Sequence, residues 1–260
     1  MKKKLILVLL IALISKEMPA QDFSQYEKHL YINKGDTLPY RLLLPQNYNP
    51  GKMYPMILFL HGSGERGRDN EAQLLHGGEW FLKDSIRQNY PAIIVFPQCS
   101  LKDSWVNKTD TYDSAGKRIF VFNTGGKPNT AIHLASKLVK FLISQYPITK
   151  RQLYVGGLSL GGMGTYEIVR LEPKLFVAAF PICGAADLSI VPSLKKVNWW
   201  IFHGAKDSTV NPQYSKMIVD ELKKVGVPVK FTLYPDAGHN SWDNVFVEPG
   251  FMEWLFSNKK

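Results

Sequence analysis

Short, continuously apolar segments alternate with longer amphipathic stretches along most of this chain, and this alternation limits the folds that it can form. The apolar segments are residues 54–60, 92–96, 153–156, 176–182, 198–202 and 228–233. Apolar residues at every position, rather than at every second one, are typical of strands that are covered on both faces. The stretches between them that carry apolar residues at helical spacing are residues 130–145, 161–171 and 215–225. The pattern predicts an α/β fold in one domain, with a mostly parallel central sheet and helices on both faces.

Two further regions border this pattern. Residues 28–33 and 40–44 flank Gly35 and Asp36, a typical turn pair, and predict an antiparallel hairpin at the sheet edge. Residues 98–127 are rich in Asn, Asp, Thr, Ser and Gly and are expected to be a long irregular loop. Because this loop follows a strand, where α/β folds place their binding loops, we expect it to form one wall of a binding cleft.

The first twenty residues have the order of regions found in a secretory signal peptide. Lys2, Lys3 and Lys4 precede ten apolar residues at positions 5–14, and a short polar stretch ends at Ala20. An N-terminal anchor is the alternative, but a bilayer span needs about 20 apolar residues. We therefore expect residues 1–20 to be cleaved and residues 21–260 to be exported to the periplasm or the extracellular space, without stable membrane insertion.

Composition excludes several classes of function. With 45% hydrophobic and 21% charged residues, the chain has the balance of a globular protein rather than a disordered one. Its net charge is +10, but the basic residues after the leader are spread out, so we expect no nucleic-acid partner. Cys99 and Cys183 each follow a separate apolar segment and are expected to be buried free thiols. No two of the six histidines are four residues apart and no Cys lies at ligand spacing, so we expect no metal.

The strongest chemical signal is the run Gly157-Leu158-Ser159-Leu160-Gly161 between a predicted strand and a predicted helix. A serine on a tight strand-to-helix turn needs small neighbours, because the backbone is strained and adjacent strands pass close to it. The amide of Leu160 would then lie at the positive end of the helix dipole, where it could stabilise an oxyanion. A glycine-rich turn with an incidental serine is the alternative interpretation.

A serine nucleophile requires a histidine base and an acid that orients the histidine. Asp207 follows the predicted strand 198–202, and His239 follows the predicted strand 228–233. This order along the chain, Ser then Asp then His, is the order of a hydrolase triad, and all three residues would meet at one edge of a parallel sheet. Asp207 is chosen over Asp187 and Asp236 because it follows its strand by a short loop, one crossover before the histidine.

The second oxyanion donor is expected in the loop after the strand at residues 54–60, where the sequence reads His61-Gly62-Ser63-Gly64-Glu65-Arg66-Gly67. The amide of Ser63 is the first candidate. The same glycines match a dinucleotide-binding fingerprint, which would indicate an oxidoreductase. The polar residues that follow are poorly suited to a helix packed on a sheet, which argues against that alternative. His61 and His203 each precede a Gly at a strand end and are expected to be structural.

These segments together resemble the α/β-hydrolase superfamily. Within it they are similar to compact secreted esterases near the dienelactone hydrolases and the feruloyl and acetyl xylan esterases. The resemblance is carried by residues 61–67, 96–99 with Trp105, 159–164, 181–184, 203–207 and 238–242. It implies a carboxylic ester hydrolase without a cofactor, with Ser159 as nucleophile, His239 as base and Asp207 as acid, acting through an acyl-enzyme. Dienelactone hydrolases use a Cys nucleophile, so Ser159 in that place favours ordinary esters.

The expected substrate is a small-molecule or polysaccharide-linked ester with a carbohydrate or aromatic part, such as a feruloyl or acetyl ester. Trp105 and Trp242 are expected to line the cleft, since indoles stack on sugars and phenolic rings, with Gln98 and His76 as weaker candidates. Two alternatives remain. A peptidase of the prolyl-oligopeptidase type has a similar catalytic domain, although this sequence contains no propeller, and a non-catalytic binding protein could use the same scaffold.

Overall fold

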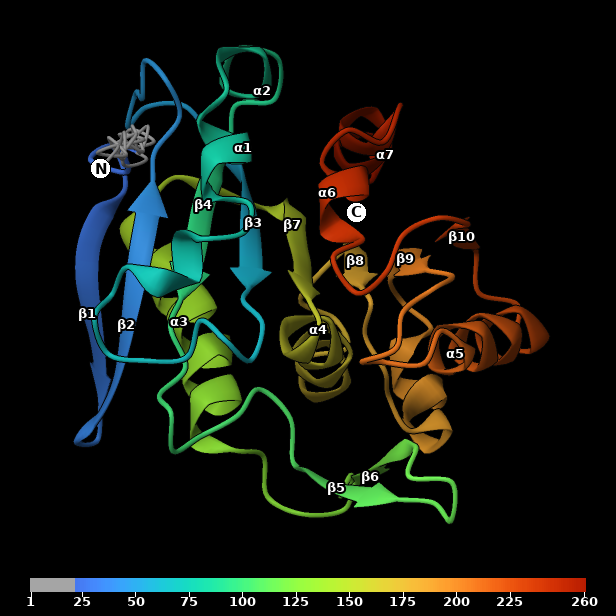
Figure 1. Ribbon diagram of the computed structural model, residues 1–260. Coiled ribbons are helices and arrows are strands. Elements are labelled where there is room, and N and C mark those ends of the chain that lie inside the picture. Colours follow the sequence, from blue (N-terminus) through green and yellow to red (C-terminus); the bar gives the residue numbers. More distant parts are fainter. Residues whose placement is uncertain (1–21) are drawn as a thin grey trace, which may run out of the picture.

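The computed structural model describes residues 22–260, and the predicted signal peptide lies outside the described residues. Within residues 22–260, eight strands form one sheet in the order β1-β2-β4-β3-β7-β8-β9-β10 (Figure 1). The bounds of these strands are β1 Glu27–Asn33, β2 Asp36–Leu43, β3 Tyr54–Leu60, β4 Ile93–Pro97, β7 Ile148–Leu158, β8 Ala178–Ile182, β9 Asn198–Gly204 and β10 Val229–Tyr234. β2 runs antiparallel to both β1 and β4, and every other neighbouring pair is parallel. The predicted α/β fold and edge hairpin are therefore confirmed.

Helices cover both faces of the sheet. They are α1 Gly78–Leu82, α2 Asp84–Asn89, α3 Thr130–Gln145, α4 Leu160–Leu171, α5 Gln213–Lys224, α6 Trp242–Val245 and α7 Phe251–Ser257, with 3₁₀ turns at Ala72–Leu74 and Leu188–Leu194. In β3, Met56, Leu58 and Leu60 pack on one face with residues of α3, α4 and α5, whereas Ile57 and Phe59 pack on the other with residues of α1 and α7. Because successive side chains of a strand point to opposite faces, a strand covered on both sides is apolar throughout.

The structure differs from the sequence-based expectation at the start of one strand and in one loop. β7 begins at Ile148 rather than at residue 153, because its first residues include the exposed Lys150 and Arg151 and lack continuous apolarity. Residues 98–127 are not irregular throughout: β5 Lys108–Tyr112 and β6 Arg118–Phe122 form a separate antiparallel hairpin. In Figure 1 this hairpin lies apart from the main sheet, beyond α3 and α4.

Both cysteines are buried free thiols. Among the helices that the structure describes, none is long and apolar enough to cross a membrane.

Candidate active site

Ser159 occupies a strained turn between β7 and α4. Its φ of 53° and ψ of −115° lie in a region that side-chain-bearing residues rarely adopt, at a cost of about 1–3 kcal/mol. The Ser159 N–H donates to the carbonyl oxygen of Ile182 at 2.9 Å, and the Ser159 carbonyl accepts from the N–H of Met163 at 3.0 Å. These contacts fix the turn on β8 and on the first turn of α4, so that the hydroxyl projects from the carboxyl end of the sheet.

The glycines around Ser159 are required by close backbone contacts. A Cβ atom on Gly157 would lie 2.5 Å from the carbonyl oxygen of Leu60, and one on Gly161 would lie 1.9 Å from the same atom. A Cβ atom on Gly162 would lie 2.6 Å from the carbonyl oxygen of Ile182. Any larger residue at these positions would push α4 away from β3 and β8 and displace Ser159.

Two loops at the same sheet edge deliver Asp207 and His239. The loop after β9 and the loop after β10 are joined by backbone hydrogen bonds from Ala205 N to Tyr234 O at 2.8 Å and from Lys206 N to Ala237 O at 2.9 Å. Gly204 allows this approach, because a Cβ atom there would lie 2.1 Å from the carbonyl oxygen of Gly238. The spacing between the acid and the imidazole is therefore set by main-chain contacts.

The three side chains form a continuous hydrogen-bonded series. His239 Nε2 lies 2.9 Å from Ser159 Oγ, and His239 Nδ1 lies 2.8 Å from Asp207 Oδ2. His203 Nε2 approaches the same Asp207 oxygen at 3.2 Å from the other side. Ser159 and His239 are partly exposed, whereas the Asp207 side chain is fully buried. Only the serine and imidazole of this series can therefore meet a ligand.

The Asp207 carboxylate is held in its ionised form. Burial alone would raise the pKa of Asp207, but hydrogen bonds from His203, His239 and the Val210 N–H outweigh it and hold that pKa well below its usual range. Oδ1 accepts from the Thr209 and Val210 N–H groups at 2.8 and 2.9 Å. Asp236, in contrast, is exposed and paired with Lys206 Nζ at 2.7 Å, so it belongs to the surface rather than to this series.

The loop after β3 is oriented by a neutral buried histidine. His61 Nε2 accepts from the Cys99 N–H at 2.9 Å, so Nδ1 carries the proton and donates to the Gly62 carbonyl at 2.6 Å. Since a trans peptide directs its N–H opposite to its C=O, the Ser63 N–H points away from His61. Ser63 and Leu160 both line the cleft at Ser159, and the Leu160 amide, in the first turn of α4, has no intrahelical acceptor.

The state of His61 should make the protein less stable in mild acid. Burial lowers the pKa of His61 from 6.5 to about 4. Between pH 6.5 and pH 4 the unfolded chain takes up a proton at His61 and the folded chain does not. The contribution of neutral His61 to the free energy of unfolding is therefore fully present above pH 6.5 and is lost as the pH drops toward 4. We expect the free energy of unfolding to decrease by about 3 kcal/mol over this range through His61.

Urea denaturation at several pH values between 4 and 7 checks this expectation. The His61→Gln variant should show a smaller pH dependence than the unmodified protein. His133→Gln, at an exposed position on α3, is the matched control and should leave the pH dependence as it is. An identical pH dependence for His61→Gln and the unmodified protein would contradict the assignment.

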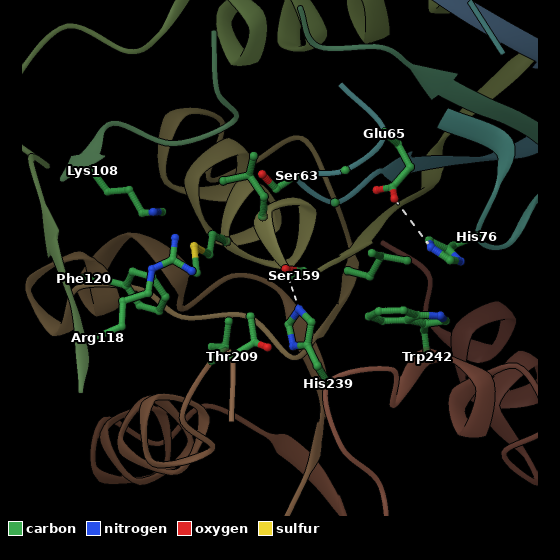
Figure 2. Close-up of a pocket in the computed structure, with 16 residues that line it drawn as sticks. Ser63, Glu65, His76, Lys108, Arg118, Phe120, Ser159, Thr209, His239 and Trp242 are labelled. Carbon is green, nitrogen blue, oxygen red and sulfur yellow. Dashed lines mark hydrogen bonds and ion pairs between the residues drawn. The ribbon is translucent and has the colours of Figure 1, made fainter. Parts of the chain in front are cut away.

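A cleft of about 230 Å³ surrounds Ser159, small for a ligand pocket. Figure 2 shows Lys108, Arg118 and Phe120 on one side of Ser159, and Glu65, His76 and Trp242 on the other. The lining residues are Gly62, Ser63, Gly64, Glu65, His76, Lys108, Arg118, Phe120, Leu158, Ser159, Leu160, Met163, Thr209, Val210, His239 and Trp242. The cleft is therefore built from the loops after β3, β7, β9 and β10, with the β5–β6 hairpin as one wall.

Two of the four substrate-binding candidates lie in this cleft and two do not. Trp242 and His76 line it, with their rings 4.9 Å apart. The prediction for Trp105 is wrong: this residue is fully buried, and its indole N–H donates to the His61 carbonyl at 3.0 Å. The prediction for Gln98 is also wrong. Its buried amide group binds the Asn70 N–H, the Glu65 carbonyl and Asp69, and so supports the loop from behind.

Sequence reasoning did not identify Glu65, Lys108, Arg118 or Phe120 as cleft residues. Lys108 and Arg118 both pair with Asp110, and both cations lie within 5 Å of the centre of the Phe120 ring. Lys108 and Asp110 occupy alternate positions of β5, whereas the composition of this segment predicts an irregular loop.

One group of potential metal ligands occurs among the described residues, at Cys183, Asp207 and His239, whose ligand atoms lie within 4.8 Å of one another. The Asp207 and His239 atoms are already hydrogen-bonded to each other. Burial raises the pKa of the Cys183 thiol far above its usual range, so this sulfur is protonated near neutral pH. The group therefore has the chemistry of a hydrogen-bonded dyad beside a thiol rather than that of a cation site.

A parallel sheet with a serine on a glycine-lined turn after a central strand is the architecture of the α/β-hydrolase class. A model of the family described as "Putative esterase" matches residues 34–240 of this chain. The match covers most of the sequence, so the chain belongs to this esterase family.

Solved structures agree with this class. A thermostable esterase is 29% identical with a TM-score of 0.80, and the alignment covers 92% of this chain and 64% of that one. A ferulic acid esterase from Anaeromyces mucronatus is 16% identical with a TM-score of 0.65, with 90% of each chain covered. The second likeness is one of fold alone.

Among curated proteins, acyl-protein thioesterase 1 from Neurospora crassa is 31% identical over 98 residues, which are 35% of this chain and 40% of that protein. Inactive dipeptidyl peptidase 10 from Mus musculus is 25% identical over 133 residues, 40% of this chain and 17% of that protein. The chain thus spans less than half the length of these two relatives.

Proposed function

We propose that this protein is a serine carboxylic ester hydrolase that acts through an acyl-enzyme. The observation that carries the proposal is the series Ser159 Oγ, His239 Nε2 and Nδ1, and Asp207 Oδ2, with both hydrogen bonds shorter than 3 Å. A serine becomes nucleophilic when an adjacent base accepts its proton, and the base acts best when an acid fixes its tautomer. Ser159 is the nucleophile, His239 the base and Asp207 the acid.

The reaction proceeds in two halves. Ser159 Oγ attacks the ester carbonyl while His239 Nε2 takes its proton, and the oxyanion that forms is stabilised by the N–H groups of Ser63 and Leu160. The imidazolium then protonates the leaving alcohol, and the acyl group remains on Ser159. Water, deprotonated by His239, then attacks this acyl-enzyme. When the bond between the acyl group and Ser159 Oγ breaks, the imidazolium returns its proton to Ser159 Oγ and the acid is released. The ionised Asp207 stabilises the positive imidazolium in both halves.

The proposed substrates are short esters with a carbohydrate-linked or aromatic part, such as acetyl or feruloyl esters of polysaccharides. The partly exposed Trp242 on one side and Phe120 on the other offer aromatic surfaces for a sugar or a phenolic ring. The small volume of the cleft disfavours a long acyl chain. The ferulic acid esterase with the same fold is consistent with this substrate class.

We also propose that the protein acts outside the cytoplasm, on the basis of the basic and apolar segments in residues 1–20. Growth of the source cells followed by fractionation would detect the mature chain in the exported fraction. A chain found only in the cytoplasm and beginning at Met1 would contradict export.

Hydrolysis of 4-nitrophenyl acetate by the purified protein tests the activity. A serine-directed fluorophosphonate should abolish this hydrolysis and add its mass to the peptide that contains Ser159. A dipeptide 4-nitroanilide, which carries an amide bond in place of the ester, should be cleaved far more slowly than 4-nitrophenyl acetate. This comparison separates an esterase from a peptidase. Absence of ester hydrolysis together with absence of labelling would instead favour a binding protein on a hydrolase scaffold.

A further inference from the structure

Glu65 lines the candidate active-site cleft and, among the residues that the structure describes, one oxygen of its carboxylate is buried and unpaired. The residue is only 7% exposed and lines the cleft, and within residues 22–260 its Oε2 atom has no hydrogen-bond partner. Its Oε1 atom lies 3.5 Å from His76 Nε2 (Figure 2). Buried polar atoms are nearly always hydrogen-bonded, because an orphaned acceptor loses its hydration without compensation. An orphaned carboxylate oxygen in the wall of a binding cleft is therefore a candidate acceptor for a hydrogen bond from a ligand.

The surrounding structure fixes this carboxylate in place. The Glu65 backbone carbonyl accepts from Gln98 Nε2 at 3.2 Å, which holds the loop after β3. The side chain packs against the loop itself, since a Cβ atom on Gly62 would lie 2.9 Å from Glu65 Oε2. The acceptor is thus held beside the segment that carries the proposed oxyanion donor at Ser63.

The neighbours of Glu65 restrict the chemistry of the ligand. A carboxylate accepts hydrogen bonds and repels anions, so the group bound here must be a donor such as a hydroxyl. An apolar acyl chain would bury the carboxylate without a partner and is disfavoured. The indole of Trp242, tilted against His76 with ring centres 4.9 Å apart, adds an apolar surface beside the acceptor. Hydroxyl donors on an apolar carbon skeleton are the features of a sugar or another polyol.

This side of the cleft is also the side of the leaving alcohol. The Trp242 ring lies edge-to-face against His239, with ring centres 5.6 Å apart. His239 must reach the oxygen of the leaving alcohol in order to protonate it, so the alcohol part of the ester lies next to His239. A hydroxyl group on that alcohol would then be close to Glu65 and Trp242.

We propose that Glu65 accepts a hydrogen bond from a hydroxyl group in the alcohol part of the ester, and that polyhydroxy alcohols are therefore the preferred leaving groups. The inference rests on the proposed function, since the hydroxyl belongs to the ester that Ser159 attacks. It makes Glu65 a specificity residue, with Trp242 supplying the apolar face.

A pair of acetate esters isolates this interaction. Glycerol 1-acetate and propyl acetate have the same acyl group and the same three-carbon alcohol, and they differ only in two hydroxyl groups. The unmodified enzyme should show a kcat/KM for glycerol 1-acetate about 10- to 100-fold above that for propyl acetate, as expected for a hydrogen bond to a charged acceptor. In Glu65→Met this preference should disappear while propyl acetate is still hydrolysed.

The matched control is Glu71→Met, the same substitution six residues away at a side chain that is 62% exposed and outside the cleft. It should keep the preference for glycerol 1-acetate. Because Glu65→Met removes an unsatisfied buried carboxylate, its Tm should equal or exceed that of the unmodified protein. Glu65→Gln retains a neutral acceptor and should keep part of the preference, which provides a second variant if Glu65→Met does not fold.

Two results would overturn the inference. Equal kcat/KM for both esters in the unmodified enzyme would remove its basis while leaving the esterase proposal intact. A preference that survives in Glu65→Met would assign the hydroxyl recognition elsewhere. If neither ester were hydrolysed, the proposed function itself would be contradicted, and the role of Glu65 with it.

Discussion

Ser159→Ala should lower kcat for 4-nitrophenyl acetate by about 10³-fold or more, because it removes the only atom that can form the acyl-enzyme. Positioning of the ester and the oxyanion donors remain, so hydrolysis should still exceed the rate in buffer. Alanine keeps the Cβ atom at the strained turn, and the backbone contacts with Ile182 and Met163 do not involve the hydroxyl. Folding should therefore be preserved, with Tm within a few degrees of the unmodified protein.

The matched control is Ser144→Ala, at an exposed position on α3 where the hydroxyl donates to the Phe141 carbonyl at 2.6 Å and accepts from Gln145 Nε2 at 3.1 Å. It should retain full activity. The fluorophosphonate should label Ser144→Ala and fail to label Ser159→Ala. Activity of Ser159→Ala close to that of the unmodified protein would rule out Ser159 as the nucleophile.

The sheet could be predicted from the sequence because its strands are buried on both faces. Continuous apolarity predicted the strands β3, β4, β8 and β9, and apolar residues at helical spacing predicted the helices α3 and α5. The β5–β6 hairpin lies outside the sheet and only Phe120 of its residues is buried, so it lacks the continuous buried pattern of the sheet strands. For this reason the sequence did not predict that Lys108, Arg118 and Phe120 line the cleft.

The candidate site likewise contains residues that the sequence predicted and residues that it did not. Ser159, Asp207 and His239 could be nominated from sequence because each follows a strand, and a parallel sheet gathers such positions at one edge. Proximity to a strand end does not determine whether a side chain faces the cleft or the core. Trp105 is in the core and Trp242 in the cleft, although both follow strands. The sequence did not identify Glu65 either, since only the three-dimensional arrangement shows that one oxygen of its carboxylate lacks a partner.

Asp207→Asn should lower kcat by roughly 10²- to 10⁴-fold through a change of tautomer at His239. The amide oxygen of Asn would take the place of Oδ1, because that atom accepts from the Thr209 and Val210 N–H groups. The NH₂ group would then replace Oδ2, facing His239 Nδ1. Since NH₂ can only donate, Nδ1 must become the acceptor and the imidazole proton must move to Nε2. His203 Nε2, which faces the same oxygen, would also lose its acceptor there.

With its proton on Nε2, His239 can no longer accept the proton of Ser159 Oγ, so the nucleophile is not activated. The control is Asp236→Asn, which makes the same change three residues before His239 at a side chain that is 88% exposed and paired only with Lys206 among the described ion pairs. Its kcat should stay within about twofold, since an exposed ion pair contributes little. The measurement is kcat for both variants on 4-nitrophenyl acetate, with circular dichroism to show that each is folded. The acid that sets the tautomer of His239 is the residue at which an amide cannot replace the carboxylate. A much larger loss of kcat for Asp236→Asn than for Asp207→Asn would therefore assign the acid to position 236.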